Sequence, residues 1–212
     1  MRFFSFCIIL IYLLSFENTG YSIDAPEIIK KVKQKYDSIE SFSADFKQIF
    51  KWKLAGETQE NAGKVFLKGK DKFRIETEEQ LIVSDGNTLW SYSKINNQVI
   101  IDNMKNADEV VLPREIFLKY SQKYRPSLLR KEKLNIFECY VLHLVSKTED
   151  VLIKEMKIWV NTKNWITLKI EQVDINQNVT IYILNNIITN KKIDSSKFIY
   201  NVPQNVEIID MR

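Results

Sequence analysis

The stretch LIVSDGNTLWSY, residues 81–92, decides the architecture that the sequence predicts. Two runs rich in Ile, Val, Thr, Leu, Trp and Tyr flank Asp85-Gly86-Asn87, and these residue types favour a pleated, half-buried surface. Asp-Gly is a strong hairpin signal because glycine adopts positive φ without a Cβ clash. On the outgoing arm, alternation puts Trp90 and Tyr92 on one face. The stretch therefore predicts a β-hairpin.

Period-two patterns continue on both sides of this hairpin. From residue 41 onward apolar and polar residues alternate, with Gln48 as the one break on the apolar face. Asn-rich links at 161–164 and 176–178 are typical of hairpin turns. Strands are predicted over 41–53, 63–68, 72–77, 99–101, 137–145, 153–160, 165–173, 179–188 and 206–210.

Two segments have helical patterns instead. Asp24 and Glu27 fit a capping box with Pro26 in the first turn, and an apolar stripe follows at Ile28, Ile29, Val32, Tyr36 and Ile39. A short second helix is predicted over 115–124, ended by Pro126. The lysines at 30, 31, 33 and 35 lie largely outside the first stripe and form either a solvated face or a docking surface for an acidic partner.

Sequential hairpins without β-α-β alternation argue against a parallel sheet. They predict a mainly β fold with some α, an antiparallel meander that curls into a closed or partly open barrel. A chain of 212 residues fits one domain. No repeat or low-complexity linker indicates a second one.

The first 22 residues are predicted to be a secretory signal peptide. A basic start precedes an apolar run from residue 3 to 16, and Gly20 and Ser22 fit the −3 and −1 positions of a cleavage site. The run is short for a transmembrane helix, although an uncleaved anchor is the alternative. The expected mature domain is 23–212, and Cys7 has no context for lipid modification.

Composition excludes several function classes. A net charge of +4 with interspersed acids and bases is too mild for a nucleic-acid-binding protein. Cys139 is the only cysteine of residues 23–212, so that range predicts neither an internal disulfide nor a thiolate metal site. Phosphate loops, dinucleotide glycine patterns and metal-ligand clusters are missing from the sequence. We therefore expect no enzyme activity, cofactor, metal or catalytic residue.

Cys139 and His143 are the one pair that resembles a catalytic dyad. On a strand they share a face but lie about 13 Å apart, from roughly 3.3 Å per residue, which is too far for a hydrogen bond. The apolar residues around them favour a strand, so we expect both to be structural.

Five motifs in order resemble the outer-membrane lipoprotein carrier family, LolA. The hairpin 81–92 resembles the family's Ser-Asp-Gly-x-x-Leu-Trp motif and is the most specific of the five. The others are the helix-to-strand opening 39–48, the strand 63–68, Phe73-Arg74, and the C-terminal 198–206, which resembles Phe-x-Phe-x-x-Pro-x-Gly-Val. The resemblance covers nearly all of residues 23–212.

The resemblance implies an incomplete antiparallel β-barrel covered by a few lid helices. It also implies a monomeric periplasmic carrier that takes acylated lipoproteins from an inner-membrane transporter and delivers them to an outer-membrane receptor. It places five side chains around one acyl-binding concave face: Phe46, Phe66, Phe73, Trp90 and Tyr92. Some family members have an Arg-Pro that contacts the lid, where this chain has Gly69-Lys70. Lys70 and Arg74 are the candidates to replace that contact.

Two other interpretations stay open. One is an outer-membrane receptor, or another exported lipid-binding module of similar fold, but such a receptor needs a lipidated cysteine at its mature start. The other is a structural or sensory domain whose aromatic residues fill a closed core.

Overall fold

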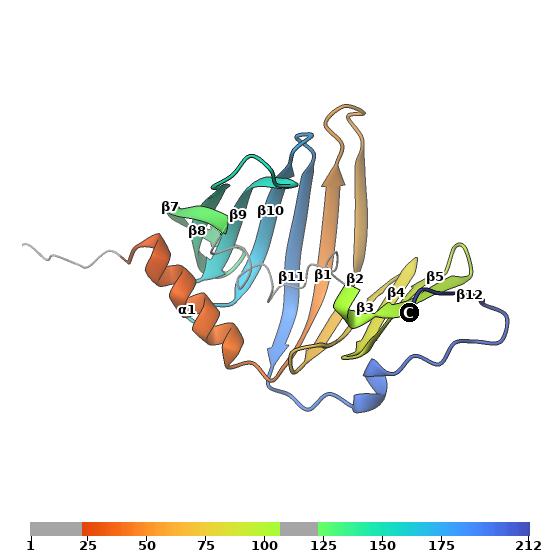
Figure 1. Ribbon diagram of the computed structural model, residues 1–212. Helices are drawn as coiled ribbons and strands as arrows, with labels where there is room; N and C mark the ends of the chain where they lie inside the picture. The colour runs from red at the N-terminus through yellow and green to blue at the C-terminus, as the bar shows by residue number, and fades with distance from the viewer. Residues whose placement is uncertain (1–22, 107–122) are drawn as a thin grey trace, which may run out of the picture.

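The computed structural model describes residues 23–106 and 123–212. Its described residues form one curled, open sheet of twelve strands with a helix against one half of it (Figure 1). The strands are β1 Ser41–Lys51, β2 Thr58–Lys68, β3 Lys72–Thr77, β4 Gln80–Asp85, β5 Thr88–Ser93, β6 Gln98–Asn103, β7 Tyr124–Leu134, β8 Phe137–Ser146, β9 Ile153–Asn161, β10 Thr167–Asp174, β11 Val179–Thr189 and β12 Glu207–Asp210. The helices are α1 Ala25–Asp37 and the 3-10 turns η1 Met104–Asn106 and η2 Ser195–Phe198.

The strand order is β12-β6-β5-β4-β3-β2-β1-β11-β10-β9-β8-β7. Two meanders therefore meet where β1 pairs with β11, and β7 and β12 form the two edges. Each pairing is antiparallel except that of β12, which runs parallel to β6. The predicted mainly β, open and curled antiparallel sheet is confirmed, and the parallel edge strand departs from it.

Helix α1 begins where the sequence predicts. The Asp24 carboxylate accepts a hydrogen bond of 2.8 Å from the backbone N–H of Glu27. Its fully buried Ile28 and Val32 pack in one cluster with side chains of β7 to β10, each worth about 1.5–3 kcal/mol by burial alone. At the other end of the helix, the Tyr36 ring lies 6.5 Å from that of Phe42 on β1. Helix α1 thus covers one face of the β7–β11 half, which we call the inner face.

The organising hairpin forms as β4 and β5. The Asp85 carboxylate accepts hydrogen bonds from the N–H groups of Asn87 and Thr88, at 2.8 and 2.9 Å. Gly86 adopts a φ of 102°, a backbone conformation that residues with a Cβ atom rarely adopt. The turn chemistry predicted from the sequence is confirmed.

The prediction that Pro126 ends a helix is wrong. Residues 115–122 of the expected second helix lie outside the described residues. Tyr124, however, begins strand β7, and Pro126 lies inside that strand opposite Leu144. Proline has no N–H to donate to a neighbouring strand. It is tolerated in β7 because β7 is an edge strand with a neighbour on one side only. The residue that was expected to end a helix sits in the sheet edge.

Cross-strand pairing assigns each side chain to a face, because directly opposed residues lie on the same side of a sheet. Phe42 pairs with Leu67, which pairs with Phe73, so all three lie on the inner face. Phe66 pairs with Arg74, and the same row continues through β4 to Trp90. That row is one residue out of phase with the first and lies on the opposite, outer face.

The C-terminal segment, residues 190–206, packs on the outer face of the other half of the sheet, the β1–β6 half. The Lys68 ammonium donates to the Ile193 carbonyl and the Ser195 hydroxyl, at 3.2 and 3.0 Å. The ammonium of Lys197 lies 4.8 Å from the centre of the Phe66 ring. The Tyr92 and Tyr200 rings are 5.9 Å apart. The two halves of the sheet are therefore covered on opposite faces.

Gly63 provides a sharp test of this register. A Cβ there would lie 2.1 Å from the Glu76 carbonyl oxygen and 3.0 Å from the Phe46 ring, and backbone cannot move aside cheaply. We expect Gly63→Ala to lower the melting temperature by roughly 10 °C, from about 3 kcal/mol of overpacking. Lys64→Ala, at the exposed neighbouring position, should change it little. Equal melting of the two variants would contradict the register.

Candidate functional site

The inner face of the β1–β6 half carries a continuous apolar surface on strands β1 to β5. Phe42, Ala44 and Val65 form a buried cluster with Leu184 of β11. Phe73 and Leu89 form a second one, with Met104 of η1 against it. Between and around the two clusters lie half-buried side chains: Phe46, Leu67, Ile75 and Ile82. We call these four the apolar strip.

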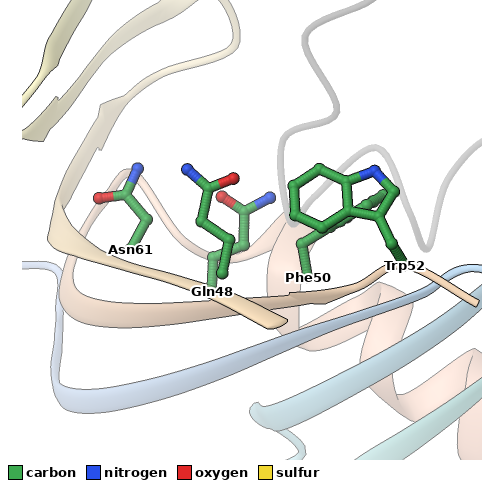
Figure 2. Close-up of a pocket in the computed structure, with 5 residues that line it drawn as sticks. Gln48, Phe50, Trp52 and Asn61 are labelled. Carbon is green, nitrogen blue, oxygen red and sulfur yellow. The ribbon is translucent and has the colours of Figure 1, made fainter. Parts of the chain in front are cut away.

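A pocket of about 260 Å³ continues this face where β1 ends and β2 begins. Figure 2 shows its side chains projecting together from the two strands. It is lined by Gln48, Phe50, Trp52, Gln59 and Asn61, and we call it the amide pocket. The Gln48 amide donates to the Tyr182 hydroxyl of β11 at 3.2 Å. The Phe50 and Trp52 rings meet edge to face at 4.3 Å.

The five residues predicted for the concave face are divided between the two faces of the sheet. Phe46 and Phe73 lie on the inner face, Phe73 fully buried and Phe46 half-buried. Phe66, Trp90 and Tyr92 lie on the outer face. The prediction that all five share one face is wrong, because alternation within a strand does not fix which face its neighbour's aromatic residues occupy.

The two predicted lid contacts, Arg74 and Lys70, lie in different surroundings. Arg74 is on the outer face, where its guanidinium meets the Glu76 carboxylate at 3.2 Å and the Lys197 carbonyl at 3.5 Å. It fastens the C-terminal segment, so its expected contact with a lid over the inner face is wrong. Lys70 is exposed in the turn between β2 and β3.

Cys139 and His143 are both on strand β8, as expected, and do not form a dyad. The Cys139 side chain is fully buried, and this burial raises the pKa of its thiol to about 11. His143 pairs instead with the Glu155 carboxylate of β9 at 2.8 Å. Within residues 23–106 and 123–212, no group of three or more His, Cys, Asp or Glu side chains is arranged to hold a metal ion.

The sequence alone does not predict the amide pocket. Gln48 stood out as the one polar residue on its alternating face. Its partners Gln59 and Asn61 are not predicted, because β2 begins at Thr58, in a polar stretch that precedes the strand predicted over 63–68. A search for amides opposite Gln48 across the hairpin would have found Asn61.

A family model described as the outer membrane lipoprotein carrier protein LolA matches residues 37–201. The chain belongs to the LolA family. The match includes the apolar strip and the amide pocket, so both lie within the part of the chain that the family shares. The described residues contain no helix long and apolar enough to cross a membrane.

Curated relatives agree with this assignment. An outer-membrane lipoprotein carrier protein of Glaesserella parasuis is 26% identical over 196 residues, which is 91% of this chain and 90% of that protein. One from Legionella pneumophila is 27% identical over 208 residues, 94% and 96% of the two chains. An uncharacterized protein of Methanocaldococcus jannaschii is 30% identical over 74% of this chain, which spans only 46% of that longer protein.

Solved structures share the fold. An uncharacterized conserved protein from Thermus thermophilus superposes with a TM-score of 0.59 at 13% identity, over 87% of this chain and 98% of its own. MucB superposes with a TM-score of 0.55 at 11% identity, over 86% of this chain and 65% of its own. At these identities the likeness concerns the sheet and its curl.

The buried thiol gives a pH-dependent prediction. Because burial holds the pKa of Cys139 near 11, its alkylation by iodoacetamide in the folded protein should accelerate only as the pH approaches that value. In urea it should accelerate through about 8.5, the ordinary cysteine pKa. Mass spectrometry of the peptide containing Cys139 measures both. Rapid labelling of the folded protein at neutral pH would contradict the placement.

The same shift has a consequence for stability. The folded state keeps the proton in the range where the unfolded chain releases it, so this group's contribution to stability is present below about pH 8.5 and declines above it. Cys139→Ala should remove that decline, measured as the pH dependence of the urea midpoint.

Proposed function

We propose that this protein is an extracytoplasmic carrier that holds the acyl chains of lipoproteins against the inner face of its sheet. In this proposal it is exported by residues 1–22 and moves lipoproteins through the periplasm as a monomer. It receives them from an inner-membrane transporter and releases them to an outer-membrane receptor. It performs no chemistry and needs no cofactor. The observation that carries the proposal is the half-buried apolar strip on the inner face.

The strip has the chemistry of an acyl-chain site. Its side chains are aliphatic or aromatic, and each of the neighbouring strands β1 to β4 contributes one of them. Burying an acyl chain is worth about 0.8 kcal/mol per methylene, or on the order of 10 kcal/mol for a long chain. A lipoprotein therefore crosses an aqueous compartment only when another apolar surface covers its chains, and the apolar strip provides such a surface.

The placement of the single described α-helix supports this use of the face. The buried residues of α1 pack with β7 to β10, whereas the apolar strip lies on β1 to β4. The outer face of the strip's strands is occupied by the C-terminal segment. The inner face is therefore the side of these strands on which we place the ligand.

Phe46→Glu tests the site. Phe46 is half-buried on the inner face, and a carboxylate against an acyl chain is costly to desolvate. We expect a folded protein whose affinity for a fluorescent C16 acyl probe falls at least about tenfold. Phe66→Glu is the matched control, since Phe66 is half-buried on the outer face beside Lys197, and it should bind the probe as the wild type does.

Two outcomes would contradict the proposal. One is a folded Phe46→Glu variant that keeps its affinity for the probe. The other is a wild type that takes up no probe while Phe46→Glu unfolds cooperatively, which identifies a filled core instead of a carrier site. Phe73 does not serve for this test, because it is fully buried and a charge there destabilises the fold in either case.

A further inference from the structure

We infer that the amide pocket binds the uncharged junction of a lipoprotein, where the carbonyl groups of its acyl chains join the glyceryl-cysteine, and that it disfavours anionic lipid headgroups. This inference rests on the proposed function and specifies the substrate at the same face. It assigns a role to Gln48, Gln59 and Asn61, which an apolar carrier site alone leaves unexplained.

The pairing of β1 with β2 places the pocket directly beyond the apolar strip. Along the inner face, Phe46 opposes Gly63, Gln48 opposes Asn61, and Phe50 opposes Gln59. Each step of two residues advances about 6.6 Å along a strand. An acyl chain that lies on the strip with its carbonyl end at Phe46 therefore presents that end to the amides within one or two such steps.

The hydrogen-bonding groups match this junction. Ester carbonyls accept hydrogen bonds, and an amide-linked acyl group both accepts and donates. A side-chain amide offers two N–H donors and a carbonyl acceptor, so it satisfies both kinds of linkage. Gln48 is oriented by its bond to the Tyr182 hydroxyl, and Asn61 projects beside it from the facing strand (Figure 2). Gln59 lines the same pocket and pairs with Phe50 across the two strands.

Charge separates this ligand from other lipids. Among residues 23–106 and 123–212, the five side chains that line the pocket carry no charge. The ionic groups of the same strands alternate to the outer face, where Lys47 and Glu60 pair at 2.7 Å. A phosphate headgroup placed among these amides loses its hydration and gains no cation from the five lining side chains. The uncharged ester and amide groups of a lipoprotein N-terminus lose much less.

The aromatic pair completes the pocket. The Phe50 and Trp52 rings lie edge to face beside the amides. Trp52 follows the last residue of β1 and is 37% exposed. An apolar wall next to hydrogen-bonding groups suits a diacylglyceryl linkage, in which ester groups lie next to the carbons of the glyceryl unit and of the acyl chains. The exposed end leaves room for the polypeptide that follows the lipidated cysteine.

The test compares two synthetic lipopeptides with identical C16 chains and peptides, one ester-linked and one ether-linked, which lacks the carbonyls. We expect the wild type to bind the ester-linked lipopeptide about tenfold more tightly, as lost hydrogen bonds of ordinary strength predict. The double variant Gln59→Leu/Asn61→Leu should lose that preference and bind the ether-linked lipopeptide as the wild type does. Gln34→Leu, an exposed amide on α1, is the control and should keep the preference.

The outcomes separate this inference from the proposed function. Equal affinity of the wild type for the two lipopeptides overturns the inference and leaves the carrier intact. Equal weakening of both by the double variant also overturns it. Binding of dipalmitoylphosphatidylglycerol as tight as that of the ester-linked lipopeptide overturns the charge selectivity. Failure of the wild type to bind either lipopeptide defeats the proposed function itself. The wild-type comparison holds even if the double variant does not fold.

Discussion

The pairing of β1 with β11 is the constraint on which the rest of the structure depends. It joins two meanders, β1–β6 and β7–β11, into one sheet whose remaining pairings are mostly between neighbours in the sequence. A bulge interrupts this ladder near Asp45, where Asn186 adopts a φ of 49° and its amide donates to the Asp45 carboxylate at 2.6 Å. The extra residue on β11 increases the local twist. Without this ladder the buried cluster of Phe42, Ala44 and Val65 would lose its contact with Leu184.

Alternation then gives the joined sheet two faces with different uses. In the β7–β11 half the inner face is closed by α1, whose buried residues form a cluster with side chains of β7 to β10. In the β1–β6 half the outer face is closed by the C-terminal segment, through Lys68, Arg74 and the Tyr92–Tyr200 contact. The apolar strip and the amide pocket lie on the inner face of that second half. The carrier proposal therefore depends on this arrangement: α1 covers the inner face of the β7–β11 half, and the C-terminal segment covers the outer face of the β1–β6 half.

Sequence alone predicted the elements better than it predicted the site. The cap at Asp24, the turn at Asp85-Gly86 and the alternation of β1 are local, and each has a short-range physical cause. The grouping of Phe46 with Trp90 failed because their relative face depends on the register of the intervening ladders, which no local pattern states. Pro126 was assigned to a helix end, although proline is tolerated equally at an edge strand. The predicted signal peptide and most of the second helix lie outside the described residues.

The most direct measurement of the central claim is residue-level photo-crosslinking with a lipopeptide that carries a diazirine in its acyl chain. Neighbouring residues of a strand point to opposite faces, so mapping the adducts by mass spectrometry distinguishes one face from the other within a single peptide. The inner-face account predicts adducts on Phe46, Leu67 and Ile75, and none on Lys47, Phe66 or Arg74. Adducts concentrated on Phe66 and Arg74, or on the C-terminal segment beside them, would contradict it.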